Sequence, residues 1–205
     1  MVKKSINLGF LLMFLLCFAL SSFAFAKTES SAELKPFYIS VGFGYSKINY
    51  AENLADLYEN HIGGIGYNVG FYIPVKPNIA IGITGNGAFD SYSGTDFWGT
   101  TTLTYNHVLF ALSSMSFLSK EIGSGPFIKA DIGIARVEAS LSSDSIFENA
   151  NLKANSGWGV GLLLGGGLAF PFVGPGKALL NVDFSLRKVD GENYKIIAFS
   201  IGYLY

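Results

Sequence analysis

The sequence predicts an all-β fold: an eight-stranded antiparallel up-and-down transmembrane β-barrel preceded by a cleaved signal peptide. Three observations predict it. Apolar side chains alternate with small or polar ones through most of the 205 residues, which is the period of a strand. Half of the residues are hydrophobic and only 14% are charged. The chain also begins with a short apolar segment. The net charge of −1 argues against a nucleic-acid partner.

Residues 1–26 have the layout of a secretory signal peptide. Two lysines precede an apolar run that is short for a membrane-spanning helix, and Ala24 and Ala26 offer small residues to the peptidase. Cleavage removes both lysines, no acidic residue, and Cys17, which is the only cysteine. The 179 residues that remain carry 12 basic and 15 acidic side chains, a net charge of −3. Without disulfides, a hydrogen-bonded architecture or a membrane must stabilise this chain.

The rest of the chain divides into a short periplasmic N-terminal segment, residues 27–35, and the barrel, residues 36–205. The connections between strands alternate in kind. Those at one end are short and rich in Pro and Gly, whereas those at the other end are polar and mostly longer. In transmembrane barrels the short turns face the periplasm and the longer loops face outward. The predicted strands cover residues 37–46, 64–75, 79–86, 99–118, 126–141, 157–170, 180–187 and 197–205.

In two of these strands, the apolar residues change from one parity to the other along the strand. In residues 99–118, Leu103 and Tyr105 lie on one parity, while Val108 and Phe110 lie on the other. A β-bulge would restore the phase, so we expect one in this strand at a position that the sequence does not define. In residues 126–141, the apolar parity switches after Arg136.

The composition of the two faces predicts which face is buried. One face is too rich in glycine for a solvated surface and suits a narrow interior. The other is apolar over about ten residues per strand, the length of a tilted strand that crosses a bilayer. A closed barrel satisfies all backbone hydrogen bonds in lipid. We therefore expect the apolar face to contact hydrocarbon. The alternative is a soluble periplasmic ligand-binding barrel with that face inward.

Four charged side chains have the inward parity. Their charges sum to zero, and unpaired charge is costly in a narrow barrel. We therefore predict a mutually paired cluster joined by three amides. It forms either a plug of polar side chains or the gate of a small pore. The charges are Lys129, Asp131, Asp183 and Arg187, and the amides are Asn68, Asn86 and Asn181.

The chain resembles the small eight-stranded outer-membrane barrels of Gram-negative bacteria, such as the opacity-protein-like surface antigens and the membrane domain of outer membrane protein A. The resemblance rests on the leader, the strand rhythm and the C-terminal strand IIAFSIGYLY. It implies a place in the cell outer membrane, with lipopolysaccharide among the lipid partners, and insertion by the barrel-assembly machinery. That machinery reads a terminal aromatic residue and another two residues earlier, which Tyr205 and Tyr203 match. The glycine expected five residues before the end is Ser200.

The search for chemistry points away from an enzyme. No catalytic, cofactor or metal motif is present, so we expect no catalytic residues, no cofactor and no metal. Barrel-type lipid A deacylases carry His-x-Ser on a strand, but Leu109 stands two residues after His107. We expect a structural or surface-interaction role, with a possible host or surface ligand held by loops 46–61 and 142–156. The alternatives are a narrow channel for small or hydrophobic solutes and a membrane-embedded lipid-modifying hydrolase.

Overall fold

The computed structural model describes residues 35–50, 60–61, 64–96, 99–145, 149–172 and 176–205. The chain divides into two compact units, Met1–Glu33 and Leu34–Tyr205. The predicted signal peptide, residues 1–26, and nearly all of the segment 27–35 lie outside the described residues, so both stay predictions. Within the described ranges, none of the helices is long and apolar enough to span a membrane.

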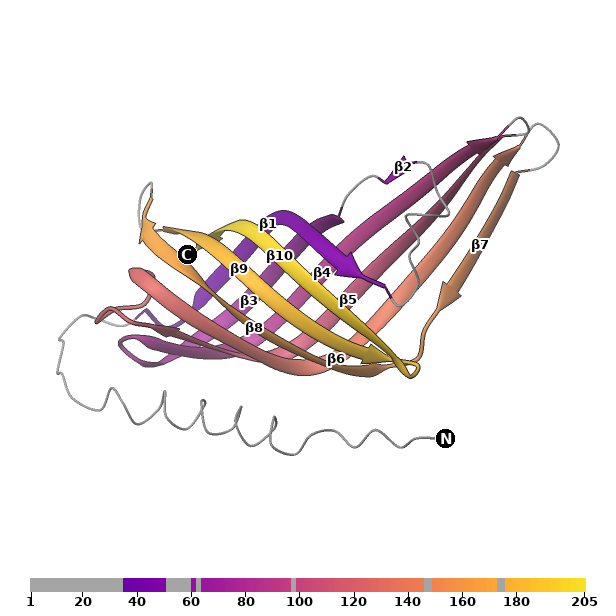
Figure 1. Cartoon of the computed structure of the whole chain (residues 1–205). Helices are drawn as coiled ribbons and strands as arrows, with labels where there is room; N and C mark the ends of the chain where they lie inside the picture. Colours follow the sequence, from indigo (N-terminus) through magenta and orange to yellow (C-terminus); the bar gives the residue numbers. More distant parts are fainter. Residues whose placement is uncertain (1–34, 51–59, 62–63, 97–98, 146–148, 173–175) are drawn as a thin grey trace. The chain divides into compact units, whose positions relative to one another are not determined.

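The second unit is a closed antiparallel barrel of eight strands, each paired with the next along the chain (Figure 1). The circle closes where the first strand pairs with the last. These pairings confirm the predicted up-and-down order. The barrel strands are β1 (Tyr38–Asn49), β3 (Gly64–Lys76), β4 (Ile79–Asp96), β5 (Gly99–Phe117), β6 (Gly125–Ser145), β8 (Gly159–Pro171), β9 (Lys177–Val189) and β10 (Glu192–Leu204). Two short strands, β2 (Asn60–His61) and β7 (Asn149–Asn155), pair with β4 and β6.

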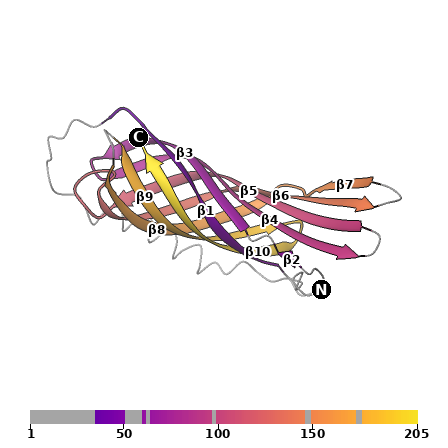
Figure 2. The same cartoon turned by 90° about the horizontal axis from the view of Figure 1, so that it is seen from above.

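Three neighbouring strands are much longer than the rest. β4, β5 and β6 contain 18, 19 and 21 residues, whereas the other barrel strands contain 12 or 13. Their upper parts and β7 project beyond the barrel as a sheet (Figures 1 and 2). The predicted loop 142–156, and the connection expected between the predicted strands 79–86 and 99–118, are therefore wrong for the most part, because β4, β6 and β7 occupy them. Polar Thr and Ser side chains continue a strand ladder when they pair across it.

Strand pairing along β5 is continuous, so the predicted bulge in residues 99–118 is wrong. Every residue from Gly99 to Ser116 has a partner on β4 without a register shift, and the pairing with β6 is equally regular. Leu103 and Tyr105 simply lie on the inner face of the same strand. The register does shift in β3, between Pro74 and Lys76, where proline has no N–H to donate.

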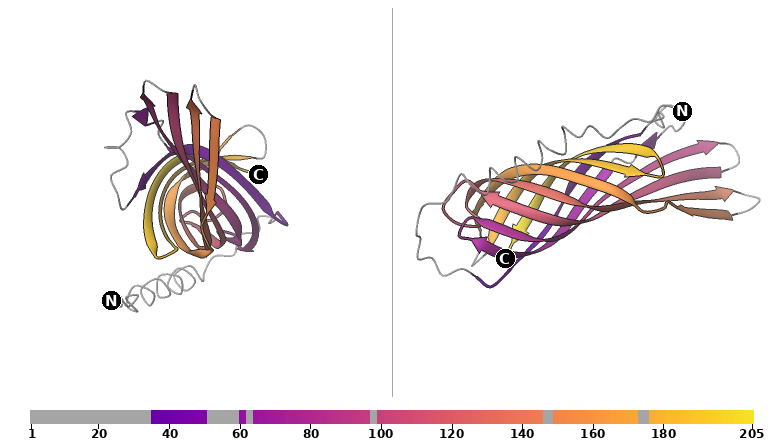
Figure 3. Two further views of the ribbon diagram at one scale, coloured as in Figure 1. Left: turned by 90° about the vertical axis from the view of Figure 1, so that its right-hand side faces the viewer. Right: turned by 90° about the horizontal axis from the view of Figure 1, so that it is seen from below.

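The lower part of the barrel is apolar outside, as predicted, and its interior holds a layer of polar and charged side chains between two apolar layers. Phe71 and Phe199, on opposite sides of β1, are 42% and 55% exposed. Figure 3 views the barrel along its length and shows the projecting strands above one side of the ring. The turns at 77–78 and 118–124 lie at the end opposite the projection. Short turns face the periplasm in such barrels, which places the projecting sheet on the outer side.

Candidate functional site

The four predicted charges lie inside the barrel and are buried. Lys129 and Asp131 come from β6, and Asp183 and Arg187 come from β9. In each pair the two residues share a parity, so their side chains enter the lumen from the same face of the strand. A Cβ at position 165 of β8 would collide with the Asp183 carboxylate. Glycine at this position therefore makes room for the charge.

Lys129 and Asp131 form the centre of the network. The Nζ atom of Lys129 lies 3.4 Å from Asp183 Oδ2 and 3.9 Å from Asp131 Oδ2. Asp131 also accepts hydrogen bonds from three side chains on β4 and β5. Its donors are Thr84 Oγ1 at 3.1 Å, Asn86 Nδ2 at 3.0 Å and Ser113 Oγ. This carboxylate is thus compensated by one cation and three donors, which a charge in a low-dielectric lumen requires.

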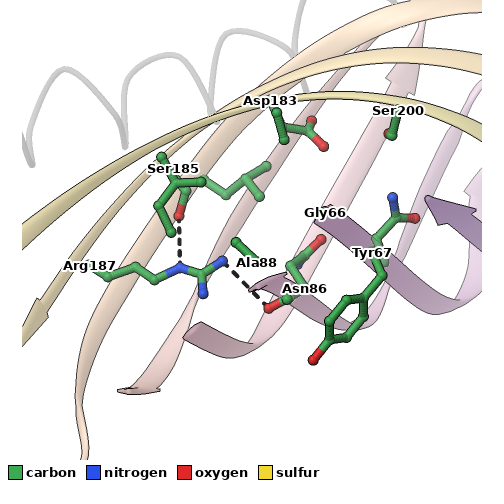
Figure 4. Close-up of a pocket in the computed structure, with 13 residues that line it drawn as sticks. Gly66, Tyr67, Asn86, Ala88, Asp183, Ser185, Arg187 and Ser200 are labelled. Atoms are coloured by element: carbon green, nitrogen blue, oxygen red, sulfur yellow. Dashed lines mark hydrogen bonds between the residues drawn. The ribbon is translucent and has the colours of Figure 1, made fainter. Parts of the chain in front are cut away.

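Arg187 is held differently from the other three charges (Figure 4). Its Nε atom donates to Ser185 Oγ at 3.2 Å, and its Nη2 atom donates to the backbone oxygen of Asn86 at 3.5 Å. Within the described part of the chain, Arg187 forms no ion pair, and its Nη1 atom has no hydrogen-bond partner. The predicted mutual pairing therefore joins three of the four charges. Arg187 enters the network only through Asn86.

A small cavity lies beside Arg187. Its volume is about 30 Å³, and its lining includes Asp183, Ser200 and Asn68. The Oδ1 atom of Asp183 has no hydrogen-bond partner among the described residues. The third predicted amide, Asn181, donates instead to Ser200 Oγ at 3.1 Å. A cavity of this size holds one or two water molecules.

Apolar side chains close the lumen below the charges. Phe117 and Phe127 pack with their ring centroids 5.3 Å apart. Tyr72 lies in the same cluster, and its hydroxyl is 3.3 Å from Ser113 Oγ in the charged layer. The cluster contains Tyr72, Ala80, Met115, Phe117, Ile122, Phe127, Ala169, Leu179 and Leu204.

A second closure lies above the charges and is built around His107. The His107 ring is fully buried and lies 4.7 Å from the Tyr194 ring, 5.9 Å from Tyr50 and 6.4 Å from Tyr105. Neither ring nitrogen has a hydrogen-bond partner among the described residues. Leu109, the next inward residue on β5, belongs to an apolar layer below the histidine. Sequence reasoning missed this layer because its three tyrosines come from three different strands or strand ends.

Just beyond the apolar belt, Asp90 organises the upper aromatic side chains. It accepts hydrogen bonds from the Tyr92 hydroxyl and the Ser91 amide, each at 3.1 Å. Burial, together with the Asp90 carboxylate, raises the pKa of the Tyr50 and Tyr92 hydroxyls well above their ordinary value. Both tyrosines therefore stay neutral, so they can pack in the cluster without a charge to solvate.

The remaining predicted residues lie at the ends of the barrel. Tyr205 exchanges backbone hydrogen bonds with Ile39 at 2.9 and 3.1 Å, and the Tyr203 ring packs 6.3 Å from Phe172. Their role as an assembly signal stays a prediction. The side chain of His61 lies outside the described residues. Within the described ranges, no group of three His, Cys, Asp or Glu side chains could hold a metal ion.

The comparisons with known proteins identify the fold of this chain. No protein-family model matches the chain, and no curated protein matches it either. Among solved structures, Ail of Yersinia pestis in complex with the heparin analogue sucrose octasulfate aligns with a TM-score of 0.50 at 15% identity. That alignment covers 82% of this chain and 97% of Ail. Neisserial surface protein A aligns with a TM-score of 0.47 at 12% identity, over 83% of this chain and 96% of its own. The chain thus has the eight-stranded barrel fold of bacterial outer-membrane proteins, which confirms the predicted fold class.

Proposed function

We propose that this protein is an integral outer-membrane barrel with a closed lumen, and that it acts at the cell surface through its projecting strands and loops. One observation carries the proposal. Side chains fill the lumen in three layers, while the strands that leave the membrane expose a polar sheet. The barrel lies in the outer membrane, because its outward belt is apolar and its fold is that of outer-membrane barrels.

The filled lumen favours a surface role over the channel alternative. Along β6 alone, the inward residues run from Phe127 at the lower closure through Lys129 and Asp131 to Val137 beside His107. The interior of an eight-stranded barrel is just wide enough for side chains to fill it. A solute would have to displace both apolar closures and the ion-paired layer between them.

The projecting sheet supplies the proposed recognition surface. Its outward side chains are mostly hydroxyls, and two pairs meet across β4 and β5, Ser91 with Thr104 at 3.4 Å and Thr95 with Thr100 at 3.2 Å. Ail binds a heparin analogue, but the described part of this sheet carries no net positive charge to match a sulfated polyanion. We therefore propose recognition by hydrogen bonding to uncharged groups.

Planar-bilayer recording tests the closed lumen. We expect the purified full chain to give no steady current. The Phe117→Gly/Phe127→Gly variant removes the lower closure, so it shows whether loss of one closure alone lets ions pass. A steady wild-type current that changes with Asp183→Asn would contradict the closed lumen and favour the channel.

Adhesion of expressing cells tests the surface role. A variant in which residues 93–102 are replaced by Asn-Gly keeps the barrel but shortens the β4–β5 projection. We expect it to lose the attachment to immobilised glycans that the wild-type chain confers. The substitution Lys120→Gln, in the turn at the opposite end, is the matched control. Equal attachment by the wild-type and shortened chains would contradict the proposal.

We also propose that the chain has no enzymatic activity. The tyrosine neighbours of His107 and the apolar Leu109 leave the histidine without a nucleophile to activate. Lipid A from cells that express the wild-type chain is expected to match lipid A from cells that express His107→Ala. Deacylated lipid A in the wild-type cells alone would overturn this proposal.

A further inference from the structure

β7 forms the outer edge of the projecting sheet, and within the described part of the chain this edge has no partner strand (Figures 1 and 2). β7 pairs with β6 over Asn149–Asn155. Lower down, β6 pairs with β8, and β8 pairs with β9. β9 ends at Val189, where the chain turns back into β10. Above that turn, the second row of backbone N–H and C=O groups on β7 is therefore open to another strand.

This edge lacks most of the features by which sheet edges avoid pairing. Residues 149–155 contain no proline, they pair with β6 without a register shift, and Lys153 is their only charged residue. The side chains of residues 151–155 are all exposed. An open edge of seven residues is long enough to accept a strand from another chain.

A row of leucines ends at the same edge. Leu103 of β5 pairs with Leu141 of β6, and Leu141 pairs with Leu152 of β7, so the three side chains share the inner face. Leu103 and Leu141 are partly buried, whereas Leu152 is 66% exposed. The row thus stops at an apolar side chain with a leucine neighbour on one side only. A further strand beside β7 would remove this apolar surface from water.

The sequence of this edge is nearly the same in both directions. Residues 149–155 are NANLKAN, so alanines and asparagines lie at equal distances on each side of Leu152, and only Asn151 and Lys153 differ. Two copies that pair antiparallel around Leu152 place leucine opposite leucine on the inner face. On the outward face, Lys153 of each copy lies opposite Asn151 of the other, so no like charges meet. The edge therefore complements a second copy of itself.

We infer that β7 pairs antiparallel with β7 of a second copy of this chain, with Leu152 at the centre of the pairing. Antiparallel strands of one sheet are related by a two-fold axis perpendicular to that sheet. Because the strands cross the membrane, this axis lies close to the membrane plane, and the two copies point in opposite directions. The partner is therefore a copy in a facing membrane. The inference uses the edge of the projection and does not depend on glycan recognition by its hydroxyl face.

One such pairing buries a small area and is weak by itself. Two membranes that each carry many copies form many pairings at once, so avidity strengthens the contact. Leu152 lies six residues from Trp158, where the exposed apolar residues that lead into β8 begin. At about 3.4 Å per residue, the pairing holds the two apolar belts within about 40 Å of each other. Phosphatidylcholine vesicles without glycolipid permit this approach and are used for the test.

Light scattering by vesicles that carry the purified chain measures their clustering. We expect Asn151→Asp to lower the protein density needed for clustering about fivefold, because each new carboxylate lies opposite Lys153 of the second copy. We expect Asn151→Lys to raise that density about fivefold, because lysine then lies opposite lysine at two places. Within one copy, residue 151 pairs with the uncharged Ser142, so neither variant meets a like charge directly opposite.

Net charge alone predicts the opposite signs. The mature chain carries a net charge of −3, so Asn151→Asp increases the general repulsion between copies and Asn151→Lys reduces it. The substitutions Asn193→Asp and Asn193→Lys make the same charge changes at an exposed position of β10 and are the matched controls. We expect these controls to show only the general effect of net charge.

Disulfide formation tests the register between facing membranes. Vesicles with Asn151→Cys and vesicles with Lys153→Cys are prepared separately and mixed. We expect mild oxidation to join the two variants, because their cysteines lie directly opposite each other, and to join neither variant to itself, because those cysteines lie too far apart along the strands. Heat-dependent gel mobility establishes that each variant is folded before reconstitution.

Three results would overturn the inference. In the first, Asn151→Lys clusters vesicles at a lower density than Asn151→Asp. In the second, Asn151→Cys forms disulfide-linked dimers with itself as readily as with Lys153→Cys. In the third, the wild-type chain clusters no vesicles at any density, which would leave the edge to a strand from a different protein.

Discussion

The lower and upper parts of β4, β5 and β6 carry their apolar side chains on opposite faces. Within the membrane, Phe110 and Ile132 point outward and are half exposed, while Asp131 points inward and is buried. In the projection, Thr102 and Ser142 point outward, and Leu103 pairs on the inner face with Leu141. The strand pairing between the two parts is continuous. The strand pairing is therefore unchanged across this boundary, and only the medium around the strands differs.

This contrast teaches how to interpret a change of apolar parity. Below the boundary the outside is hydrocarbon, so apolar residues are favoured there. Above it the outside is the aqueous and headgroup layer, and the aromatic side chains of the described residues pack on the inner face near Tyr92 and Tyr105. Because side-chain direction alternates strictly along a strand, the same pairing then requires apolar residues on the other parity. A parity change without a bulge marks the edge of the membrane.

The largest expected effect comes from the buried charges of the lower part. Lys129→Met leaves Asp131 and Asp183 without their shared cation, and breaking a buried pair in this way costs about 3–5 kcal/mol of unfolding free energy. The double variant Lys129→Met/Asp183→Asn keeps one negative and one positive charge in the layer. We expect it to recover part of the loss. Urea titration of the barrel in vesicles measures both, and a double variant less stable than the single one would contradict the network.

The second largest effect is expected from a lysine on the outward face, whose cost differs between the lower and upper parts of β6. Ile132→Lys puts a charge in the hydrocarbon belt, with an expected cost of about 2–4 kcal/mol. Ser142→Lys, on the same face of the same strand but above the boundary, is expected to cost at most about 1 kcal/mol. The same urea titration compares them. Equal costs would mean that the boundary does not fall between these residues.

The smallest effect concerns the inner face of the projection. Tyr105→Ala removes a ring that packs 4.9 Å from Tyr50, so we expect a loss of about 1–3 kcal/mol in local stability. Thr104→Ala, the outward neighbour, should change it by less than about 0.5 kcal/mol. Amide hydrogen exchange of the upper β5 residues reports both. A larger effect from Thr104 would reverse the assigned faces.

Much of the fold follows from local pattern. Strict alternation predicted the eight strands and their apolar exterior, because each outward residue meets the same medium. The projecting ends of β4 and β6 were missed, since the Ser and Thr of residues 91–95 and the Ser of residues 142–145 match the composition of a loop as well as that of a polar strand. The inward parity of Lys129 and Asp183 was readable, but the separate position of Arg187 depends on which strands face each other across the lumen.

Spin labels along β5 test most directly that this strand is continuous while its apolar residues change from the outward to the inward face. The only cysteine, Cys17, lies in the predicted signal peptide, so the mature chain offers a background without cysteine. Single cysteines can then be introduced at Thr102, Thr104, Phe110 and Leu112, with Leu103 and Leu109 as inward controls. We expect a water-soluble nickel chelate to relax labels at 102 and 104, and oxygen dissolved in the lipid to relax labels at 110 and 112. The period of two should persist throughout. A one-residue shift of phase between 104 and 110 would show a bulge and contradict the account.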